Sequence, residues 1–553
     1  MTANFPIDRR SLLAASVVGG AASALPAGAA GTSAAGLAAA AGTLTTPTST
    51  IVDTTAGRVR GFVRNGITIY RGLPYAGKVS GEGRFLPAVP AKGWTGIRST
   101  LSYGPVCPQP ERDWSNDEMA FYADWNDGHP GEDCLTLNIW TGSTQKTFRR
   151  PVMVWLHGGG FVAGSSHEQP SYDGARLAGR GVVVVSVNHR LGAFGFMDLS
   201  AVGGSDYAAS GNLGMTDIVL ALRWVRDNIA QFGGDPDRVT IFGQSGGGGK
   251  VASLMAMPAA KGLFHRAIVM SGSFRPMQSQ DQAREFTEAM MRELGTGDIA
   301  ALRRVEARRL VAAGEAVQRR LSGRSLPPGF GKGRISLGRM WSPVDDGITF
   351  EPGAWANAAP AVSRDVPLMV GTVRDEFRLS TIVANEAALR GRLDAAYKAD
   401  GPAMLEALHA DFPGMSSNDL NGVLSGVGWR LSALDQLNLK AAQGGAPAYG
   451  YWFTYSPPLL DGRMGVPHCA DIAYAFDNTR LADQLTGNSP EAQAVADALS
   501  GAFLSFAKDG APIVKGQTWR PHDASTPTMV FERTASLVHS PAPRTFALAQ
   551  KLA

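Results

Sequence analysis

The stretch RVTIFGQSGGGGKV holds a serine in the spacing that nucleophilic serines require, with Ser245 between Gly243 and Gly247. The β-forming run 239–242 comes before it, and helix-forming residues follow from Val251. This order predicts a strand, a tight turn and a helix, with the serine in a strained backbone conformation and its hydroxyl exposed above a sheet. The helix dipole at this point favours developing negative charge, so the turn predicts a reactive nucleophile.

The glycine run after this serine also resembles a phosphate-binding loop, because it ends in Lys250. Such a loop has the pattern G-x-x-x-x-G-K followed by Ser or Thr. Counting back from the lysine, the first glycine of the pattern falls on Gln244, and the residue after the lysine is Val251. The pattern fails at both positions. G-x-S-x-G alone is weak in a chain with 67 glycines, so the flanking strand and helix decide the interpretation.

A second glycine run follows the apolar segment 151–155, in the residues His157-Gly158-Gly159-Gly160-Phe161. Because glycines have no Cβ atom, the backbone N–H groups of such a turn can approach and bind an oxyanion. We expect two donors from this turn and a third from Gly246, the residue after the serine, to form an oxyanion hole. Loss of one such donor typically raises a reaction barrier by about 3 kcal/mol.

The elements that must position these groups alternate between strand and helix patterns. The β-branched run 182–187 is typical of a strand covered on both faces, and 212–232 has apolar residues at helical spacing. Further strands are expected at 266–270 and 366–370. The alternation predicts an α/β fold with a large, mainly parallel central sheet flanked by helices.

The N-terminal part of the chain has the features of an export signal. Asp8-Arg9-Arg10 opens a weakly hydrophobic run, which resembles a twin-arginine signal peptide. We therefore expect a signal at 1–41, a linker at 42–50 and one catalytic domain at 51–553. The run is too poor in large apolar residues to be a stable membrane span, so we expect an exported protein, periplasmic or secreted.

Within the domain, short antiparallel strands are expected from Ile51 onward, where the sequence alternates and is punctuated by glycines. The segments at about 275–338 and 379–428 are helix-rich, and we expect them to form helical cap insertions over the site.

The composition is that of an ordinary globular protein, with 44% hydrophobic and 18% charged residues and a formal charge of +4. No basic stripe interleaved with aromatic residues indicates a nucleic-acid partner. The three cysteines lack the spacing of a zinc site, so we expect neither a metal nor a cofactor. The sequence does not fix an oligomeric state.

A serine nucleophile in this fold is followed along the chain first by an acid and then by a histidine. The histidines after the serine are His265, His409, His468, His522 and His539. Of these, His468 lies in a turn after proline- and glycine-rich sequence, and a histidine on a loop can reach across strand ends to act as a base. For the acid, Asp375 and Glu376 follow the strand expected at 366–370.

Four stretches of the chain together resemble a known family: GEDCLTLNIW, HGGGF, GNLGMTDIVLALRWVRDNIAQFGGDPDRVTIFGQSGGG and LFHRAIVMSGS. They are similar to the type B carboxylesterases, the cholinesterase-like and para-nitrobenzyl-esterase-like branch of the α/β-hydrolases. The resemblance runs from about Ile51 to near the C-terminus. It implies the α/β-hydrolase fold for the whole domain.

The resemblance also implies roles for single residues, with the nucleophile on Ser245 and the base on His468. It puts the acid on Glu376, with Asp375 as the alternative, and a supporting hydroxyl behind these residues on Ser271. The implied oxyanion donors are Gly159, Gly160 and Gly246. The chain departs from the family pattern at three positions, where Gly246 stands for the usual alanine, Phe377 for glycine and Asp471 for glutamate.

Cys107 and Cys134 enclose a stretch rich in aromatic and acidic residues. From the residues alone, they form either a disulfide, which an exported protein can keep, or two buried thiols. The resemblance implies the disulfide. Cys469 has no partner cysteine by this pairing, and we expect a buried, inert thiol.

These residues predict a serine hydrolase that cleaves small-molecule carboxylic esters through an acyl-enzyme intermediate. An amidase or a carbamate hydrolase would use the same groups. A non-catalytic binding protein of cholinesterase type is the alternative from another class, and such proteins typically lose a residue of the Ser-His-acid triad.

Overall fold

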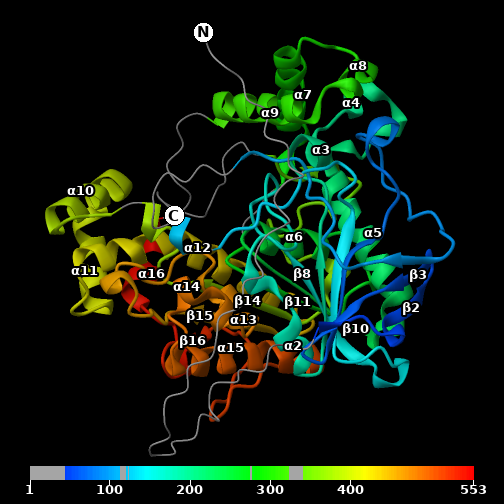
Figure 1. Cartoon of the computed structure of the whole chain (residues 1–553). Coiled ribbons are helices and arrows are strands. Elements are labelled where there is room, and N and C mark those ends of the chain that lie inside the picture. Colours follow the sequence, from blue (N-terminus) through cyan, green and yellow to red (C-terminus); the bar gives the residue numbers. More distant parts are fainter. Residues whose placement is uncertain are drawn as a thin grey trace, which may run out of the picture. The chain divides into compact units, whose positions relative to one another are not determined.

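A mixed sheet organises the chain from Leu44 onward in the computed structural model (Figure 1). The structure describes residues 44–111, 120–122, 124–273, 277–322, 341–380 and 382–552. The expected signal at 1–41 lies outside these residues. Part of the expected linker is ordered, because Leu44–Thr45 forms strand β1 and pairs with a later strand.

Twelve strands make up this sheet in the described part of the chain. Their spatial order is β1 (Leu44–Thr45), β4 (Phe62–Arg64), β5 (Ile67–Pro74), β7 (Thr136–Thr141), β9 (Val183–Val187), β8 (Arg150–Leu156), β10 (Gly234–Gln244), β11 (Arg266–Met270), β14 (Leu368–Val373), β15 (Ala448–Phe453), β16 (Pro527–Phe531) and β17 (Ser536–His539). Neighbours from β9 to β16 are parallel, and the pairs at both ends are antiparallel. The predicted α/β class with a large central sheet is confirmed.

Two small sheets accompany the large one. The first consists of β2 (Ile51–Thr54), β3 (Gly57–Arg60) and β6 (Ile97–Ser99), and the second of β12 (Gln278–Ser279) and β13 (Val344–Asp345). The antiparallel pairs β2/β3 and β4/β5 are the short N-terminal strands that the sequence predicts.

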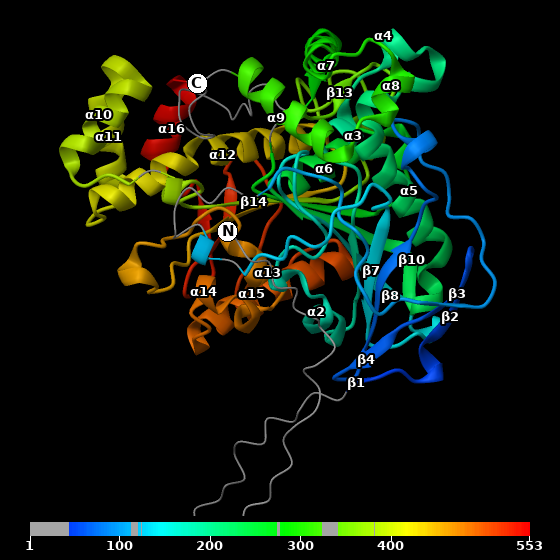
Figure 2. The same ribbon diagram turned by 45° about the horizontal axis from the view of Figure 1, so that its top comes forward.

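Helices cover both faces of the large sheet. Those that contact it are α2 (Ala175–Gly179), α5 (Leu213–Asn228), α6 (Gly246–Met255), α12 (Ser417–Ala442) and α15 (Pro490–Asp509). Figures 1 and 2 show α6 on one side of the sheet and α15 on the other. Within the described residues, no helix combines the length and the apolar content that crossing a membrane requires.

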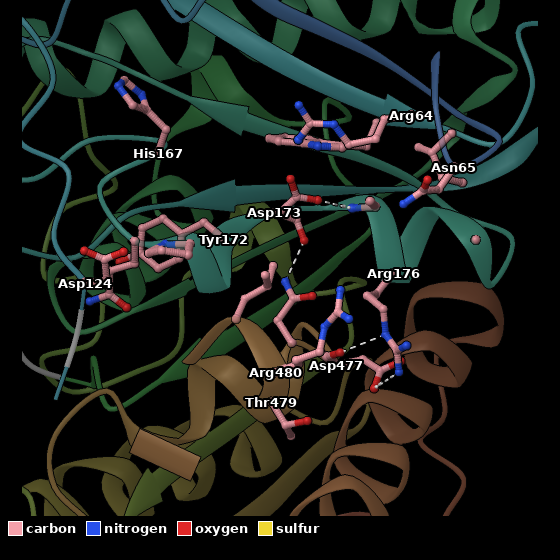
Figure 3. Close-up of a pocket in the computed structure, with 18 of the residues that line it drawn as sticks. Arg64, Asn65, Asp124, His167, Tyr172, Asp173, Arg176, Asp477, Thr479 and Arg480 are labelled. Carbon is pink, nitrogen blue, oxygen red and sulfur yellow. Dashed lines mark hydrogen bonds and ion pairs between the residues drawn. The ribbon is translucent and has the colours of Figure 1, made fainter. Parts of the chain in front are cut away.

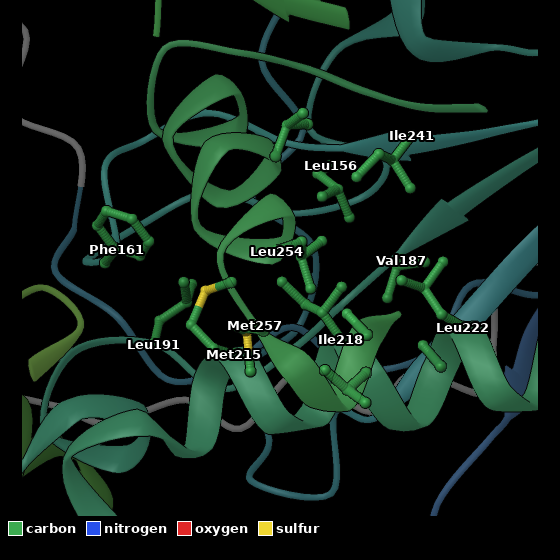
Figure 4. Close-up of a cluster of buried hydrophobic side chains, with 14 of the residues drawn as sticks. Leu156, Phe161, Val187, Leu191, Met215, Ile218, Leu222, Ile241, Leu254 and Met257 are labelled. Atoms are coloured by element: carbon green, nitrogen blue, oxygen red, sulfur yellow. The ribbon is translucent and has the colours of Figure 1, made fainter. Parts of the chain in front are cut away.

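The core is split into two layers because successive side chains of a strand point to opposite faces. In β8, Val152 and Val154 belong to the cluster that includes α5 and α6, whereas Met153 and Trp155 belong to the cluster that includes α15. Figure 4 shows part of the first layer, in which Ile218, Leu222 and Leu254 of the helices gather with Leu156 and Ile241 of the strands. All five of these side chains are buried.

The remaining helices occupy the connections between strands. They are α3 (Gly192–Phe196), α4 (Ser200–Gly203), α7 (Gln280–Leu294), α8 (Ile299–Arg304), α9 (Ala307–Ser322), α10 (Glu386–Tyr397), α11 (Gly401–Asp411), α13 (Ala470–Ala475), α14 (Asp483–Thr486) and α16 (Pro543–Leu552). The segments expected as cap insertions therefore contain α7 to α9 and α10 to α12. Residue 428, the expected end of the second insertion, lies inside α12, which runs on to Ala442 and packs on β14 and β15.

Candidate active site

Ser245 stands at the turn between β10 and α6, where its backbone has φ 57° and ψ −124°. A non-glycine residue with positive φ is strained, so the surrounding contacts must hold it. Its N–H donates to the carbonyl oxygen of Met270 at 2.8 Å, and its own carbonyl accepts from Gly249 N–H at 3.0 Å. A Cβ atom on Gly247 would lie 2.0 Å from the carbonyl oxygen of Leu156, so this turn requires a glycine beside the strand.

The imidazole of His468 is held by Glu376. Nδ1 of His468 lies 2.5 Å from Oε2 of Glu376, and the backbone N–H of His468 donates to the Glu376 carbonyl at 2.7 Å. The other carboxylate oxygen, Oε1, accepts from Ser271 Oγ at 2.7 Å and from Val373 N–H at 3.2 Å. The Glu376 carboxylate is fully buried, and its hydrogen bonds to Ser271, Val373 and His468 hold it in one orientation.

Asp375, the alternative acid, is engaged elsewhere. Both of its oxygens lie 2.8 Å from the guanidinium of Arg374, and Oδ2 accepts from Val466 N–H at 3.0 Å. A second guanidinium, that of Arg378, lies 3.7 Å from Oδ2 of the same carboxylate. Asp375 therefore anchors the loop that carries His468, while Glu376 is the carboxylate that contacts the ring.

Two aromatic side chains bracket the histidine ring. Phe377 stacks on His468 with ring centroids 4.9 Å apart and an interplanar angle of 23°, and Trp429 lies at the same separation with an angle of 51°. Phe377 stands at the position where the family resemblance leads one to expect glycine. The phenyl ring therefore restricts the imidazole and adds apolar surface around it.

The structure brings His468 next to the residue that precedes the serine. Nε2 of Gln244 lies 3.3 Å from Nε2 and 3.4 Å from Nδ1 of His468, and Oε1 of Gln244 accepts from Cys469 Sγ at 3.1 Å. Within the described residues, Ser245 Oγ makes no hydrogen bond, including none to the imidazole. Catalytic hydrogen bonds are often long in structures without substrate and shorten when it binds.

The glycine turn after β8 lies directly against the serine turn. A Cβ atom on Gly158 would be 3.6 Å from Ser245 Cβ, and a Cβ atom on Gly246 would be 2.5 Å from Gly160 N. Gly159 and Gly160 have φ of 76° and 62°, a conformation that favours glycine. No acceptor among the described residues takes the N–H groups of Gly159, Gly160 or Gly246. These three donors are therefore available to an oxyanion beside the serine.

The site therefore consists of a serine at a strained turn, a histidine that is hydrogen-bonded to a buried carboxylate, and three backbone N–H groups without an acceptor among the described residues. The carboxylesterase family model matches residues 48–544 of the chain. The chain belongs to the carboxylesterase family. The para-nitrobenzyl esterase of Bacillus subtilis (strain 168) is 32% identical to this carboxylesterase over 501 residues, which cover 89% of this chain and 97% of that protein.

Two further relatives cover nearly as much of this carboxylesterase. The phenmedipham hydrolase of Pseudarthrobacter oxydans is 33% identical over 484 residues, covering 84% of this chain and 91% of that protein. A solved esterase from Clostridium hathewayi, described as hydrolysing aliphatic aromatic polyesters, superposes with a TM-score of 0.80 at 33% identity, covering 93% of this chain and 100% of that chain. The predicted family, the α/β-hydrolase fold and the class of carboxylic ester hydrolase are confirmed.

The structure holds Cys107 and Cys134 of this carboxylesterase as free, buried thiols. The disulfide that the resemblance implies is therefore not formed in it. The two side chains are nonetheless neighbours that share a hydrogen bond. This hydrogen bond and burial together raise the pKa of Cys134 well above its usual value. Cys107 Sγ also accepts from Leu191 N–H at 3.2 Å. No group of His, Cys, Asp and Glu in the described part of the chain could hold a metal ion.

A cavity of about 1120 Å³ lies elsewhere in the described part of the chain (Figure 3). Neither Ser245 nor His468 lines it; its walls include Tyr172, Arg176 and Asp477. Two of its charged groups pair with each other, since Arg176 donates to Asp477 Oδ1 at 3.0 Å, as the dashed lines in Figure 3 mark. This cavity is separate from the serine and histidine that the sequence singles out.

Sequence reasoning missed two contacts of Gln244, one with the His468 ring and one with Cys469 Sγ. Gln244 occupies the variable position of the G-x-S-x-G pattern, so the pattern itself carries no information about it. Cys469 follows His468 directly, but its contact with Gln244 joins residues 225 positions apart. Only the packing of the two loops against each other creates this contact.

Proposed function

We propose that this carboxylesterase cleaves esters through an acyl-enzyme intermediate formed on Ser245. His468 takes the proton of Ser245 Oγ, the oxygen attacks the ester carbonyl carbon, and the resulting oxyanion is bound by the N–H groups of Gly159, Gly160 and Gly246. The imidazolium then gives its proton to the leaving alcohol oxygen as the ester bond breaks. Water releases the acyl group as the carboxylic acid by the same route.

The hydrogen bond between His468 and Glu376 is the observation that carries this mechanism. Because Nδ1–H donates a hydrogen bond to the buried carboxylate at 2.5 Å, Nε2 keeps its lone pair and is the nitrogen that can accept the serine proton. The carboxylate then stabilises the imidazolium that forms. Ser271 and Val373 hold this carboxylate in place through its other oxygen.

Replacement of the nucleophile tests the mechanism directly. Ser245→Ala should lose turnover of a para-nitrophenyl ester and covalent labelling by an organophosphate, measured by intact mass. Ser253→Ala is the control, because Ser253 is a buried serine on helix α6, the helix that begins directly after Ser245. Native-like turnover in Ser245→Ala would remove the mechanism, whatever the control does.

An ester with an aromatic group is the substrate class that the surroundings of His468 favour. Phe377, which is partly exposed, puts aromatic surface against the base, and aromatic rings pack well on such surfaces. The relationship to a para-nitrobenzyl esterase supports the same class. Purified protein should show a higher kcat/KM for benzyl acetate than for ethyl acetate, and equal values would contradict this preference.

Export and oxidation belong to the same proposal. We infer that residues 1–41 direct the protein through the twin-arginine route to the periplasm or beyond, and that Cys107 and Cys134 form a disulfide there. In such a compartment a thiol oxidant takes two electrons and two protons from the adjacent thiols. Intact mass after treatment with iodoacetamide checks this. In protein recovered from the periplasm, iodoacetamide should alkylate two fewer thiols before reduction than after it.

A further inference from the structure

Lys250, the lysine that ends the glycine run of α6, contacts the glycine turn 157–161 with its side chain. Its side chain is fully buried, and Nζ donates to the carbonyl oxygens of His157 at 2.9 Å and Gly158 at 3.4 Å. The ammonium also lies 5.5 Å from the ring centroid of Phe161, at the end of the same turn. All of these contacts are with residues 157–161.

The Gly158 carbonyl shares its peptide group with a proposed oxyanion donor, and it is approached by Lys250 Nζ at 3.4 Å and by His157 Nδ1 at 3.0 Å. The carbonyl of Gly158 and the N–H of Gly159 are parts of one planar peptide group and point in opposite directions. A donor that fixes the carbonyl on one side therefore fixes the direction of the N–H on the other. A run of glycines needs such a restraint, because glycine has more backbone freedom than any other residue.

The ionisable groups around Lys250 are two histidines and one carboxylate. His157 and His189 stack with ring centroids 5.0 Å apart, and burial, reinforced by the Lys250 charge, holds the pKa of each well below its usual value. Burial lowers the pKa of Lys250 to about 7, and the carboxylate of Glu168 opposes this shift only in part. Among the described residues, no carboxylate lies within ion-pair distance of Nζ, so burying this charge costs folding free energy.

We propose that Lys250 is a positioning residue for the oxyanion hole, whose ammonium holds the Gly158–Gly159 peptide so that the Gly159 N–H points at the developing oxyanion. This inference rests on the proposed acyl-enzyme mechanism, in which Gly159 is a donor. It assigns a role to the lysine that made the glycine run resemble a phosphate-binding loop.

The test is Lys250→Met, which keeps an extended side chain of similar length and removes all three donors. We expect kcat on a para-nitrophenyl ester to fall about tenfold or more, with KM changed less than twofold, because the interaction acts in the transition state. The inhibition constant of a trifluoromethyl ketone, which forms a tetrahedral adduct, should rise by the same factor. Lys250→Gln retains an amide donor and should recover part of both losses.

Lys440 provides a matched control elsewhere in the fold. It is also fully buried, and its Nζ donates to the carbonyl oxygens of Ser363 at 3.0 Å and Arg364 at 2.7 Å. Lys440→Met should lower the melting temperature and leave kcat and the inhibition constant unchanged. A lysine that merely supports the fold would behave in this way at position 250 as well.

The inference is overturned if Lys250→Met, or Lys250→Gln where the methionine variant does not fold, keeps native kcat and native affinity for the trifluoromethyl ketone. Its failure is distinct from failure of the proposed mechanism. If Ser245→Ala is inactive while the Lys250 variants keep native kcat, only the role of the lysine is wrong. If Ser245→Ala stays active, the mechanism itself is wrong.

Discussion

Nδ1 of His468 lies 2.5 Å from Oε2 of Glu376, although 92 residues separate the two along the chain. The neighbouring Asp375 points to Arg374 and Val466 instead. Two adjacent acidic residues therefore have different tasks: Glu376 orients the His468 ring, and Asp375 fixes the loop that carries it. This division leads directly to a pair of variants with opposite expected effects.

Glu376→Gln should lower kcat by roughly 10³- to 10⁴-fold, because an amide in place of the carboxylate favours the wrong tautomer of His468 and does not stabilise the imidazolium. Asp375→Asn should keep kcat within a few-fold and lower the melting temperature, since it weakens the buried contact with Arg374. Steady-state kinetics and thermal melts on both proteins check this. The reverse pattern would assign the catalytic acid to Asp375.

Gly246→Ala should impair the oxyanion hole, although relatives of this family usually have alanine at this position. In this chain the added Cβ would lie 2.2 Å from the carbonyl oxygen and 2.5 Å from the nitrogen of Gly160. Both atoms are backbone, so the turn must move and Gly160 N–H shifts away from the oxyanion. We expect kcat to fall by about 10²-fold, as for the loss of one donor.

Gly391→Ala is the control for this substitution. Gly391 lies at an exposed position of helix α10 and has open space where a Cβ would be. Alanine there should raise stability slightly and leave kcat unchanged, since alanine favours helix more than glycine does. A Gly246→Ala protein with native kcat would mean that Gly160 moves aside at no cost to transition-state binding.

Gln244→Glu should shift the pH dependence of ester hydrolysis. The Gln244 amide nitrogen lies 3.3 Å from Nε2 of His468, so a carboxylate at this place would stabilise the imidazolium. The acidic limb of the kcat/KM profile should then move to higher pH by about one unit or more. Gln244→Met adds no charge and should leave this limb in place. Identical limbs in the native and Glu variants would exclude electrostatic contact between the two side chains.

Asp471 should make stability depend on pH. Its carboxyl is fully buried and accepts a hydrogen bond from Tyr451 at 2.7 Å, and burial raises its pKa to about 7. Since the pKa is higher in the folded than in the unfolded state, the folded protein binds the proton more tightly, and this stabilisation is lost as pH rises between about 4 and 7. The stability of the native protein relative to Asp471→Asn should fall by about 1.4 kcal/mol per pH unit over this range.

Denaturation by urea at several pH values between 5 and 8 measures this difference directly. The free energy of unfolding of the native protein minus that of Asp471→Asn should become steadily more negative up to about pH 7 and then stay constant. A gap that does not change with pH would mean that Asp471 titrates alike in the folded and unfolded chains.

Local sequence is sufficient for the serine turn and the strands around it. The conformation of Ser245 follows from its immediate neighbours, because β-branched residues before it favour a strand and Gly243 and Gly247 allow the tight approach. The HGGGF turn is likewise readable as a set of open donors, since glycine conformations depend on a few adjacent residues. The order of nucleophile, acid and base along the chain leaves four histidines after Glu376, and the proline- and glycine-rich turn around His468 favours that one as the base.

Tertiary packing alone decides which side chains meet. The choice between Glu376 and Asp375 depends on which of two adjacent side chains faces the loop of His468, and neither composition nor spacing contains that direction. The contact of Lys250 with the carbonyl of His157 joins residues 93 positions apart. Such contacts arise from the way α6 and the turn after β8 pack on the sheet, and short-range preferences act over only a few residues.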